Sequence, residues 1–138
     1  MILLDTSGLL AWIDSAQTRH AEVVAAVQSL DPPFLLSPFV LAELDYLLAT
    51  RVGSGAELAF LSEVATGAYR LTHFDAHDVG RARGVIEKYA DLEIGLADAS
   101  IVVLAERHRA RDVLTLDERH FRVLMAGGEP FRLLPADH

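Results

Sequence analysis

The sequence predicts a three-layer α/β/α sandwich with a central parallel sheet. Short apolar runs alternate along the chain with longer segments of helical periodicity. Strands that are separated by helices are joined by right-handed crossovers, so they lie parallel and helices cover both faces of the sheet. The chain has 138 residues, 51% of them hydrophobic, and no repeat or linker. We therefore expect one domain over residues 1–138.

Element boundaries follow from the apolar runs and from helix start and stop signals. Pro32 and Pro33 end the second helix, Ser37 and Pro38 begin the third, and Ser54 to Glu57 predicts a capping box. The predicted strands are 2–4, 34–36, 69–72, 113–116 and 131–134. The predicted helices are 6–13, 19–30, 39–51, 54–65, 75–89, 96–109 and 117–125.

The composition excludes several classes of protein. The absence of cysteine rules out disulfides, thiolate zinc sites and a cysteine nucleophile. No apolar run approaches the roughly 18 residues that a membrane-spanning helix needs. The first residues, Met1 to Asp5, lack the basic start and long apolar stretch of a secretory signal. We expect a cytoplasmic protein without a membrane partner.

The net charge and the distribution of the arginines lead to opposite expectations about a nucleic-acid partner. The net charge of -8 argues against a nucleic-acid partner. Six of the 12 Lys and Arg residues nevertheless fall between Arg107 and Arg132, on both sides of Asp117 in the sequence. Arginine makes bidentate phosphate contacts that lysine does not, although a solvated charged face would show the same pattern. The predicted RNA contacts are Arg107, Arg109, Arg119 and Arg122.

Four carboxylates occupy positions that suit a metal site. Asp5 and Asp117 follow apolar runs, and Glu43 and Asp98 interrupt the apolar stripes of predicted helices. A buried acid is costly unless it is paired or bound to a metal. In a parallel sheet, ligands bind beyond the carboxyl ends of the strands, where Asp5 and Asp117 would lie. Convergence of the four would make an all-oxygen site for Mg²⁺ or Mn²⁺.

Each acid also has an ordinary structural interpretation. Asp5 and Asp117 could cap the helices that follow them, and Asp98 could be a favourable charge in a first helical turn. Thr115 could donate a hydrogen bond that orients a carboxylate or a water. The histidines show no metal-ligand spacing, and surface placement is the simpler interpretation for His120 and Arg119.

The motifs together resemble a known family. They are Asp5-Thr6-Ser7 after an apolar strand, Ala42-Glu43-Leu44 after Ser37-Pro38, Gly95-Leu96-Ala97-Asp98-Ala99, and Leu114-Thr115-Leu116-Asp117 leading to His120-Phe121. In this order and at these separations they resemble the PIN domain and, more narrowly, the VapC ribonuclease toxins of toxin-antitoxin pairs. The likeness covers essentially the whole chain.

The resemblance implies an activity, a cofactor and partners. It implies a Mg²⁺- or Mn²⁺-dependent endoribonuclease in which Asp5, Glu43, Asp98 and Asp117 are the catalytic and metal-binding quartet. We expect Thr6 and Thr115, which stand beside Asp5 and Asp117 in the sequence, to support these acids. It also implies a homodimer, silenced by a cognate VapB-type antitoxin, that cleaves structured RNA such as tRNA or the ribosomal sarcin-ricin loop. Attack by a metal-activated water would leave 5'-phosphate and 3'-hydroxyl ends.

Other functions stay open at this point. A PIN-like RNA-processing nuclease that is not a toxin, or a non-catalytic binding scaffold, would carry similar motifs. An aspartyl-phosphate enzyme ranks low because position 7 is serine and the single lysine, Lys88, lies inside a predicted helix. Surplus apolar residues on the first and third helices, Trp12 above all, could line a groove for an amphipathic partner helix.

Overall fold

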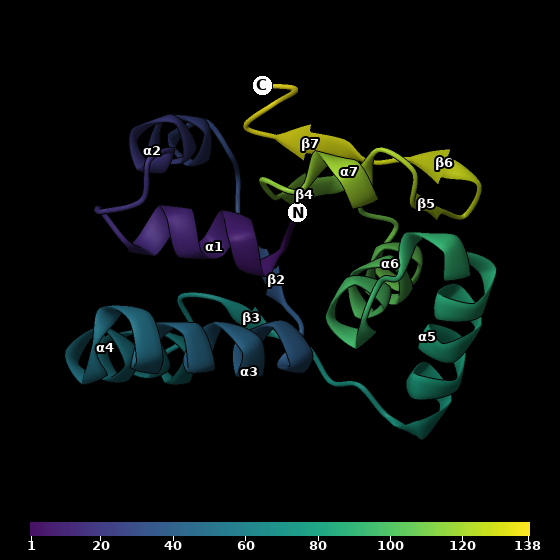
Figure 1. The fold of residues 1–138 in the computed structure, drawn as a ribbon, viewed down its shortest axis with the longest axis horizontal. Coiled ribbons are helices and arrows are strands. Elements are labelled where there is room, and N and C mark those ends of the chain that lie inside the picture. The colour runs from purple at the N-terminus through teal and green to yellow at the C-terminus, as the bar shows by residue number, and fades with distance from the viewer.

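A central parallel sheet of five strands organises the molecule (Figure 1). The computed structural model describes residues 1–138. The strand order is β3-β2-β1-β4-β7 and every neighbouring pair is parallel. These strands are β1 (Ile2–Leu4), β2 (Phe34–Leu36), β3 (Arg70–Leu71), β4 (Asp112–Leu114) and β7 (Arg132–Leu134). The predicted fold class is confirmed.

Helices fill the connections between the strands. In Figure 1, α1, α2 and α4 lie on the left of the view, α3 lies below β2 and β3, and α5 and α6 lie on the right. The helices are α1 (Thr6–Ile13), α2 (His20–Gln28), α3 (Pro38–Leu47), α4 (Ser54–Ala65), α5 (Ala76–Lys88), α6 (Leu96–His108) and α7 (Glu118–Phe121). A π-helical turn, Leu48–Val52, joins α3 to α4, and a short 3-10 helix, Ala90–Leu92, follows α5.

The strand order creates a switch point between β1 and β4. The chain leaves β1 toward β2 on one side, and it leaves β4 toward β7 on the other. Connections that diverge in this way leave a crevice at the carboxyl ends of the two strands. Asp5 directly follows β1, and Asp117 follows β4 by three residues, so both acids enter this crevice.

The core explains why β1 and α6 are so apolar. Ile2, Leu3 and Leu4 are all buried because the central strand is covered on both faces. Every residue of α6 from 99 to 105 is buried as well, since α6 packs against α5, α3 and β1. No helix has both the length and the apolar character needed to cross a bilayer.

Two predicted helices end earlier than expected. The third gives way at Leu48 to the π-helical turn, which closes at Gly53 with φ of 139°. The last ends at Phe121, and Met125 instead begins a small antiparallel hairpin of β5 (Met125–Ala126) and β6 (Glu129–Pro130). Gly127 and Gly128 both have positive φ in its turn, a conformation open to glycine at little cost.

The capping box predicted at Ser54 is wrong. Ser54 is the first residue of α4, Gly53 holds the cap position, and no side chain caps this helix. A capping box forms instead at α5, where Asp75 accepts from the Asp78 backbone N–H and Asp78 accepts from that of Asp75. Here aspartate takes both roles, whereas the usual sequence pattern has serine or threonine followed by glutamate or glutamine.

Trp12 is not free to meet a partner. Its ring lies 5.2 Å from that of Phe34 and 5.8 Å from that of Tyr69, and it packs against the core. On the third helix, Leu44 is buried and Tyr46 is 66% exposed. The predicted surplus of apolar side chains is therefore mostly core.

Candidate active site

The four predicted acids line one cavity of about 420 Å³ at the carboxyl edge of the sheet. Asp5 comes from the end of β1, Glu43 from α3, Asp98 from the first turn of α6, and Asp117 from the loop after β4. Thr6, Ser7 and His120 also line it, with an apolar wall that includes Leu10, Leu47 and Leu96. Asp5 and Asp117, which are 112 positions apart in the sequence, thus share one cavity.

Asp5 is buried and held in place by two hydroxyls. Its Oδ2 accepts from Thr115 Oγ1 at 2.6 Å and from Ser7 Oγ at 2.8 Å. Burial raises the pKa of Asp5, and these two hydrogen bonds partly oppose the rise. Thr115 and Ser7 in turn accept from the backbone N–H groups of Asp117 and Leu116. The β4 loop is therefore tied to Asp5, as the prediction that Thr115 orients a carboxylate requires.

The ionisation of Asp98 is strongly perturbed by its surroundings. Its side chain is 20% exposed, and its pKa is raised to about 7. Burial is the largest cause and the charge of Asp5 the next, with Asp117 and Glu43 adding to the repulsion and His120 opposing it. A carboxyl placed among other carboxyls holds its proton more tightly, because ionising all of them in one cavity is unfavourable. A bound cation would reverse that effect.

Asp117 caps a helix and faces the cavity at the same time. Its Oδ1 accepts from the His120 backbone N–H at 3.0 Å, while Oδ2 lies 2.8 Å from His120 Nδ1. The same Nδ1 lies 3.5 Å from Asp98 Oδ2. The expected surface placement of His120 is therefore wrong: α7 turns the ring inward against the two acids.

Glu43 differs from the other three because it is exposed. It lines the cavity, and its charge contributes to the raised pKa of Asp98. Of its predicted apolar helical neighbours, Tyr46 points to solvent and Leu47 lines the same cavity. Glu43 thus reaches the rim of the site from α3.

Comparison with known proteins supplies the family. The sequence matches the family model of the PIN domain over residues 2–124. The chain belongs to the PIN-domain family. It is 48% identical over 135 residues to ribonuclease VapC26 of Mycobacterium tuberculosis (strain ATCC 25618 / H37Rv), a match that covers 97% of this chain and 100% of the relative. Within the PIN-domain family, it therefore falls among the VapC ribonucleases.

Solved structures confirm the fold. The crystal structure of Mycobacterium tuberculosis VapC20, a sarcin-ricin loop cleaving toxin, superposes with a TM-score of 0.79 at 23% identity, covering 85% of this chain and 90% of VapC20. A toxin-antitoxin complex from Klebsiella pneumoniae gives a TM-score of 0.71 at 18% identity, covering 91% of this chain and 94% of that one.

The residues of this PIN domain fit a hard divalent cation. Carboxylate oxygens of Asp98 and Asp117 and a ring nitrogen of His120 lie within 4.8 Å of one another. One buried polar atom at the same cavity, Thr6 Oγ1, has no hydrogen-bond partner. An unpartnered hydroxyl oxygen beside clustered carboxylates suits a polar, positively charged ligand.

Two of the predicted RNA contacts lie away from this cavity. Arg107 pairs with the buried Asp78 and donates to the His73 carbonyl at 2.9 Å. Arg107 and Arg109 are at the far end of α6, nine and eleven residues from Asp98, which is roughly 14 to 16 Å along a helix. They are close to Asp98 in the sequence but not in space.

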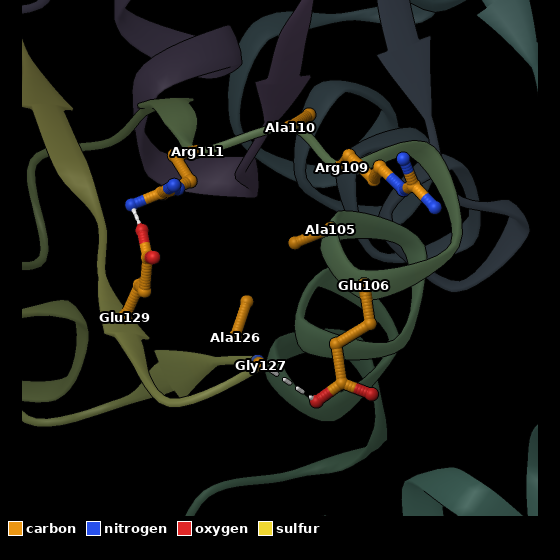
Figure 2. Close-up of a pocket in the computed structure, with 8 residues that line it drawn as sticks. All are labelled: Ala105, Glu106, Arg109, Ala110, Arg111, Ala126, Gly127 and Glu129. Atoms are coloured by element: carbon orange, nitrogen blue, oxygen red, sulfur yellow. Dashed lines mark hydrogen bonds and ion pairs between the residues drawn. The ribbon is translucent and has the colours of Figure 1, made fainter.

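Arg109 and Arg111 border a second cavity of about 410 Å³ at the amino edge of the sheet. Figure 2 shows Arg111 reaching across to Glu129, with which it forms an ion pair, while the Arg109 guanidinium points away from the interior. Glu106 accepts from the Gly127 backbone N–H on the opposite wall. One ion pair, between Arg111 and Glu129, joins lining residues of this cavity, which contains none of the four predicted acids.

The remaining predicted contacts lie on or near α7. Arg122 is paired with Asp137 and Glu118, whereas Arg119 is exposed and has no ion pair. Arg119 stays a predicted RNA contact.

Two residues of the site were not predicted from the sequence: Ser7 as a partner of Asp5, and Arg51 as a lining residue of the acidic cavity. Ser7 stands beside the Asp5 motif and could have been found there, but nothing in the sequence marks Arg51.

Proposed function

We propose that this protein is a metal-dependent endoribonuclease and the toxin of a VapBC-type toxin-antitoxin pair. The observation that supports this most strongly is the shared cavity of Asp5, Glu43, Asp98 and Asp117, with Asp98 protonated far more readily than a free carboxyl. Four acids that repel one another in one crevice suit a site that a cation completes. Membership of the VapC ribonucleases supports the reaction.

The proposed chemistry assigns each residue a part. Asp98 and Asp117 would hold Mg²⁺ or Mn²⁺, with Glu43 at the rim and Asp5 on the sheet side. A bound ion of this kind lowers the pKa of a water and neutralises charge that develops on the phosphate. Thr115 and Ser7 fix the Asp5 carboxylate so that it does not reorganise during the reaction. Thr6 Oγ1 has no hydrogen-bond partner in the protein, and His120 Nδ1 lies against Asp117 Oδ2, where it can hold that carboxylate in position.

The proposed substrate is structured RNA in the cytoplasm. The name of the VapC20 structure describes cleavage of the sarcin-ricin loop, and either that loop or a tRNA is the substrate class we propose here. Because water and not the RNA 2'-hydroxyl would attack, the products should carry 5'-phosphate and 3'-hydroxyl ends. Ends with a 2',3'-cyclic phosphate would contradict this mechanism.

The proposed partner is a VapB-type antitoxin, and the proposed resting form is a homodimer. Large apolar side chains are exposed along α3, the π-helical turn and α4, where Tyr46 is 66% and Leu58 63% exposed. Large apolar side chains exposed on consecutive elements of the chain support a protein partner there. Co-expression with the neighbouring antitoxin should give a stable complex that no longer arrests growth. If the protein expressed alone does not arrest growth, the toxin role is contradicted and the proposed nuclease activity is not.

Cleavage by matched variants tests the nuclease directly. Total RNA is incubated with the purified protein and Mn²⁺, and the new ends are mapped. Asp5→Asn, Glu43→Gln and Asp98→Asn should each lower the rate about 100-fold or more, the scale of losing one group that stabilises transition-state charge. Asp31→Asn, an exposed loop acid outside the cavity, is the control. Equal rates in all five proteins would eliminate the catalytic assignment.

A further inference from the structure

Arg51 is the only arginine or lysine that lines the acidic cavity. It lies in the π-helical turn after α3, on the same wall as Glu43 and Leu47. His120 is the only other side chain of the lining that can carry positive charge. The proposed metal site does not by itself explain why a permanently charged cation lies at the edge of this carboxylate-rich cavity.

The π-helical turn explains how Arg51 reaches this wall. Glu43, Leu47 and Arg51 are spaced by four residues, and four residues of α-helix advance about 40° beyond a full turn. Two such steps would leave Arg51 about 80° away from Glu43. A π-helical turn holds more residues because its hydrogen bonds span five positions, so each residue advances less and the drift is reduced. The turn from Leu48 to Val52 thus keeps Arg51 in line with Glu43.

Arg51 also has no protein partner. Its side chain is exposed, and no carboxylate lies within 4.0 Å of it. Most other arginines are paired: Arg19, Arg81, Arg83, Arg107, Arg111, Arg122 and Arg132 each form an ion pair. A guanidinium left free beside four acids can accept an anionic ligand without first breaking a contact.

We propose that Arg51 binds a backbone phosphate of the RNA next to the one that is cleaved. The inference rests on the proposed nuclease function and adds a specific binding residue to it. Phosphates entering a cavity with four acids meet repulsion, and a guanidinium fork at the rim offsets it. Arg51 lies eight residues after Glu43, a rise of roughly 10 to 12 Å across α3 and the π-helical turn, so we assign it to a neighbouring phosphate and not to the reacting one.

This role predicts a particular kinetic pattern. Contacts that are equally strong in the ground state and the transition state change KM and leave kcat unchanged. Arg51→Ala should therefore raise KM about tenfold, as expected for one charge-assisted contact, with kcat nearly the same. Loss of a group at the reacting phosphate would instead lower kcat.

The test is RNA binding without cleavage. In an Asp98→Asn background, binding of a short, fluorescently labelled RNA stem-loop, which belongs to the proposed class of structured substrate, is measured over a range of salt concentrations. Arg51→Ala should weaken binding about tenfold and reduce the slope of log K against log salt by about 0.7 to 0.9, the range for one phosphate contact on a single or a double strand. Arg51→Lys should keep the slope because the charge remains.

Arg83→Ala is the matched control, since it removes the same charge from a side chain that is 77% exposed on α5. The role of Arg51 would be overturned if Arg51→Ala left the affinity and the slope unchanged, or if Arg83→Ala changed them equally. Cleavage of RNA by the wild type would leave the proposed nuclease function standing in that case. Absence of both RNA binding and cleavage in the wild type would instead overturn the proposed function, and the inference with it.

Discussion

Asp98 shows how position converts an ordinary carboxyl into a proton-binding group. It lies in the first turn of α6, where the helix dipole favours a negative charge. Its pKa nevertheless rises to about 7, because burial and the charge of Asp5 outweigh both the dipole and the opposing effect of His120. The apolar neighbours Ile94, Ile101 and Val102 predict the burial from sequence, but the charged neighbours come from distant segments.

The raised pKa predicts how Asp98 affects stability without metal. Its pKa is 3.8 for a free carboxyl and about 7 in the fold. The folded protein binds the Asp98 proton more tightly than the unfolded chain does, so removal of that proton at high pH destabilises the fold. Relative to Asp98→Asn, the wild type should therefore lose roughly 2 to 4 kcal/mol of unfolding free energy as pH rises from about 4 to about 8. Urea unfolding in EDTA at both pH values measures it. The difference between the wild type and Asp31→Asn should not change with pH, because both proteins keep Asp98. A difference between the wild type and Asp98→Asn that is also constant with pH would contradict this explanation.

Thr115 supports the site through one hydroxyl that donates to Asp5 and accepts from the Asp117 backbone N–H. Thr115→Val keeps the shape but leaves a buried carboxylate short of a donor, which should cost about 1 to 3 kcal/mol of unfolding free energy. RNA cleavage should fall as well. Thr115→Ser restores the hydroxyl and should recover most of both quantities. If Thr115→Val and Thr115→Ser behave alike in urea unfolding and in cleavage, the hydroxyl has no such part.

Among the elements, α1 approaches β4 unusually closely, and Gly8 makes this possible. A Cβ at Gly8 would overlap the carbonyl group of Leu114, at the end of β4. That contact sets the distance between the start of α1 and the loop that carries Thr115 and Asp117. The sequence shows Gly8 only as a glycine in a predicted helix, so its close approach to β4 could not be inferred.

Two alanine substitutions should have opposite signs. Gly8→Ala should destabilise the protein by about 1 to 3 kcal/mol through overpacking. Gly84→Ala, in the middle of α5 with open space around it, should stabilise it by about 0.5 to 1 kcal/mol through helix propensity. Thermal or urea unfolding compares them. Equal effects of the same sign would show that helix propensity and not contact with β4 governs position 8.

The pair of Asp78 and Arg107 fastens α5 to α6. Arg107 lowers the pKa of Asp78 from 3.8 to about 2, aided by the hydrogen bond from the Asp75 backbone N–H. This contribution is complete above about pH 4 and is lost as pH falls through about 2, because the carboxylate must then be protonated. Asp78→Asn should cost about 2 kcal/mol at neutral pH and almost nothing near pH 2. Urea unfolding of the wild type and Asp78→Asn at both pH values measures this. A stability difference near pH 2 as large as at neutral pH would contradict the role of the ion pair.

Elements marked by their own sequence, such as an apolar run or a helix cap, could be predicted. Elements that depend on contacts with the rest of the fold could not. The apolar runs at β1 and β2 and the Ser37-Pro38 start of α3 are as expected, with Ser37 accepting from the Phe39 backbone N–H at 3.1 Å. The π-helical turn has no local signature in the sequence. The β5–β6 hairpin has one in Gly127-Gly128, which marks a turn, but its strands of two residues each are too short to show an alternating pattern.

At the scale of the whole molecule, the strand order brings the acids together. The carboxyl edge could be predicted, since Asp5 and Asp117 follow parallel strands that are neighbours in the sheet. The arginines could not be placed in the same way. Because α6 runs back across the sheet from Asp98, residues that follow Asp98 in the sequence end at the opposite edge. The basic segment from Arg107 to Arg111 is therefore far from the acids it flanks in the chain.

The central claim is that these acids form one cation site, and direct metal titration tests it. Binding of Mn²⁺ is measured by calorimetry for the wild type, Asp98→Asn and the control Asp31→Asn. The wild type and the control should bind with equal affinity, more tightly as pH rises through about 7, because the metal displaces the Asp98 proton. Asp98→Asn should bind at least about tenfold more weakly and without that pH dependence. Identical titrations for the wild type and Asp98→Asn, or no binding by the wild type at any pH, would contradict the account.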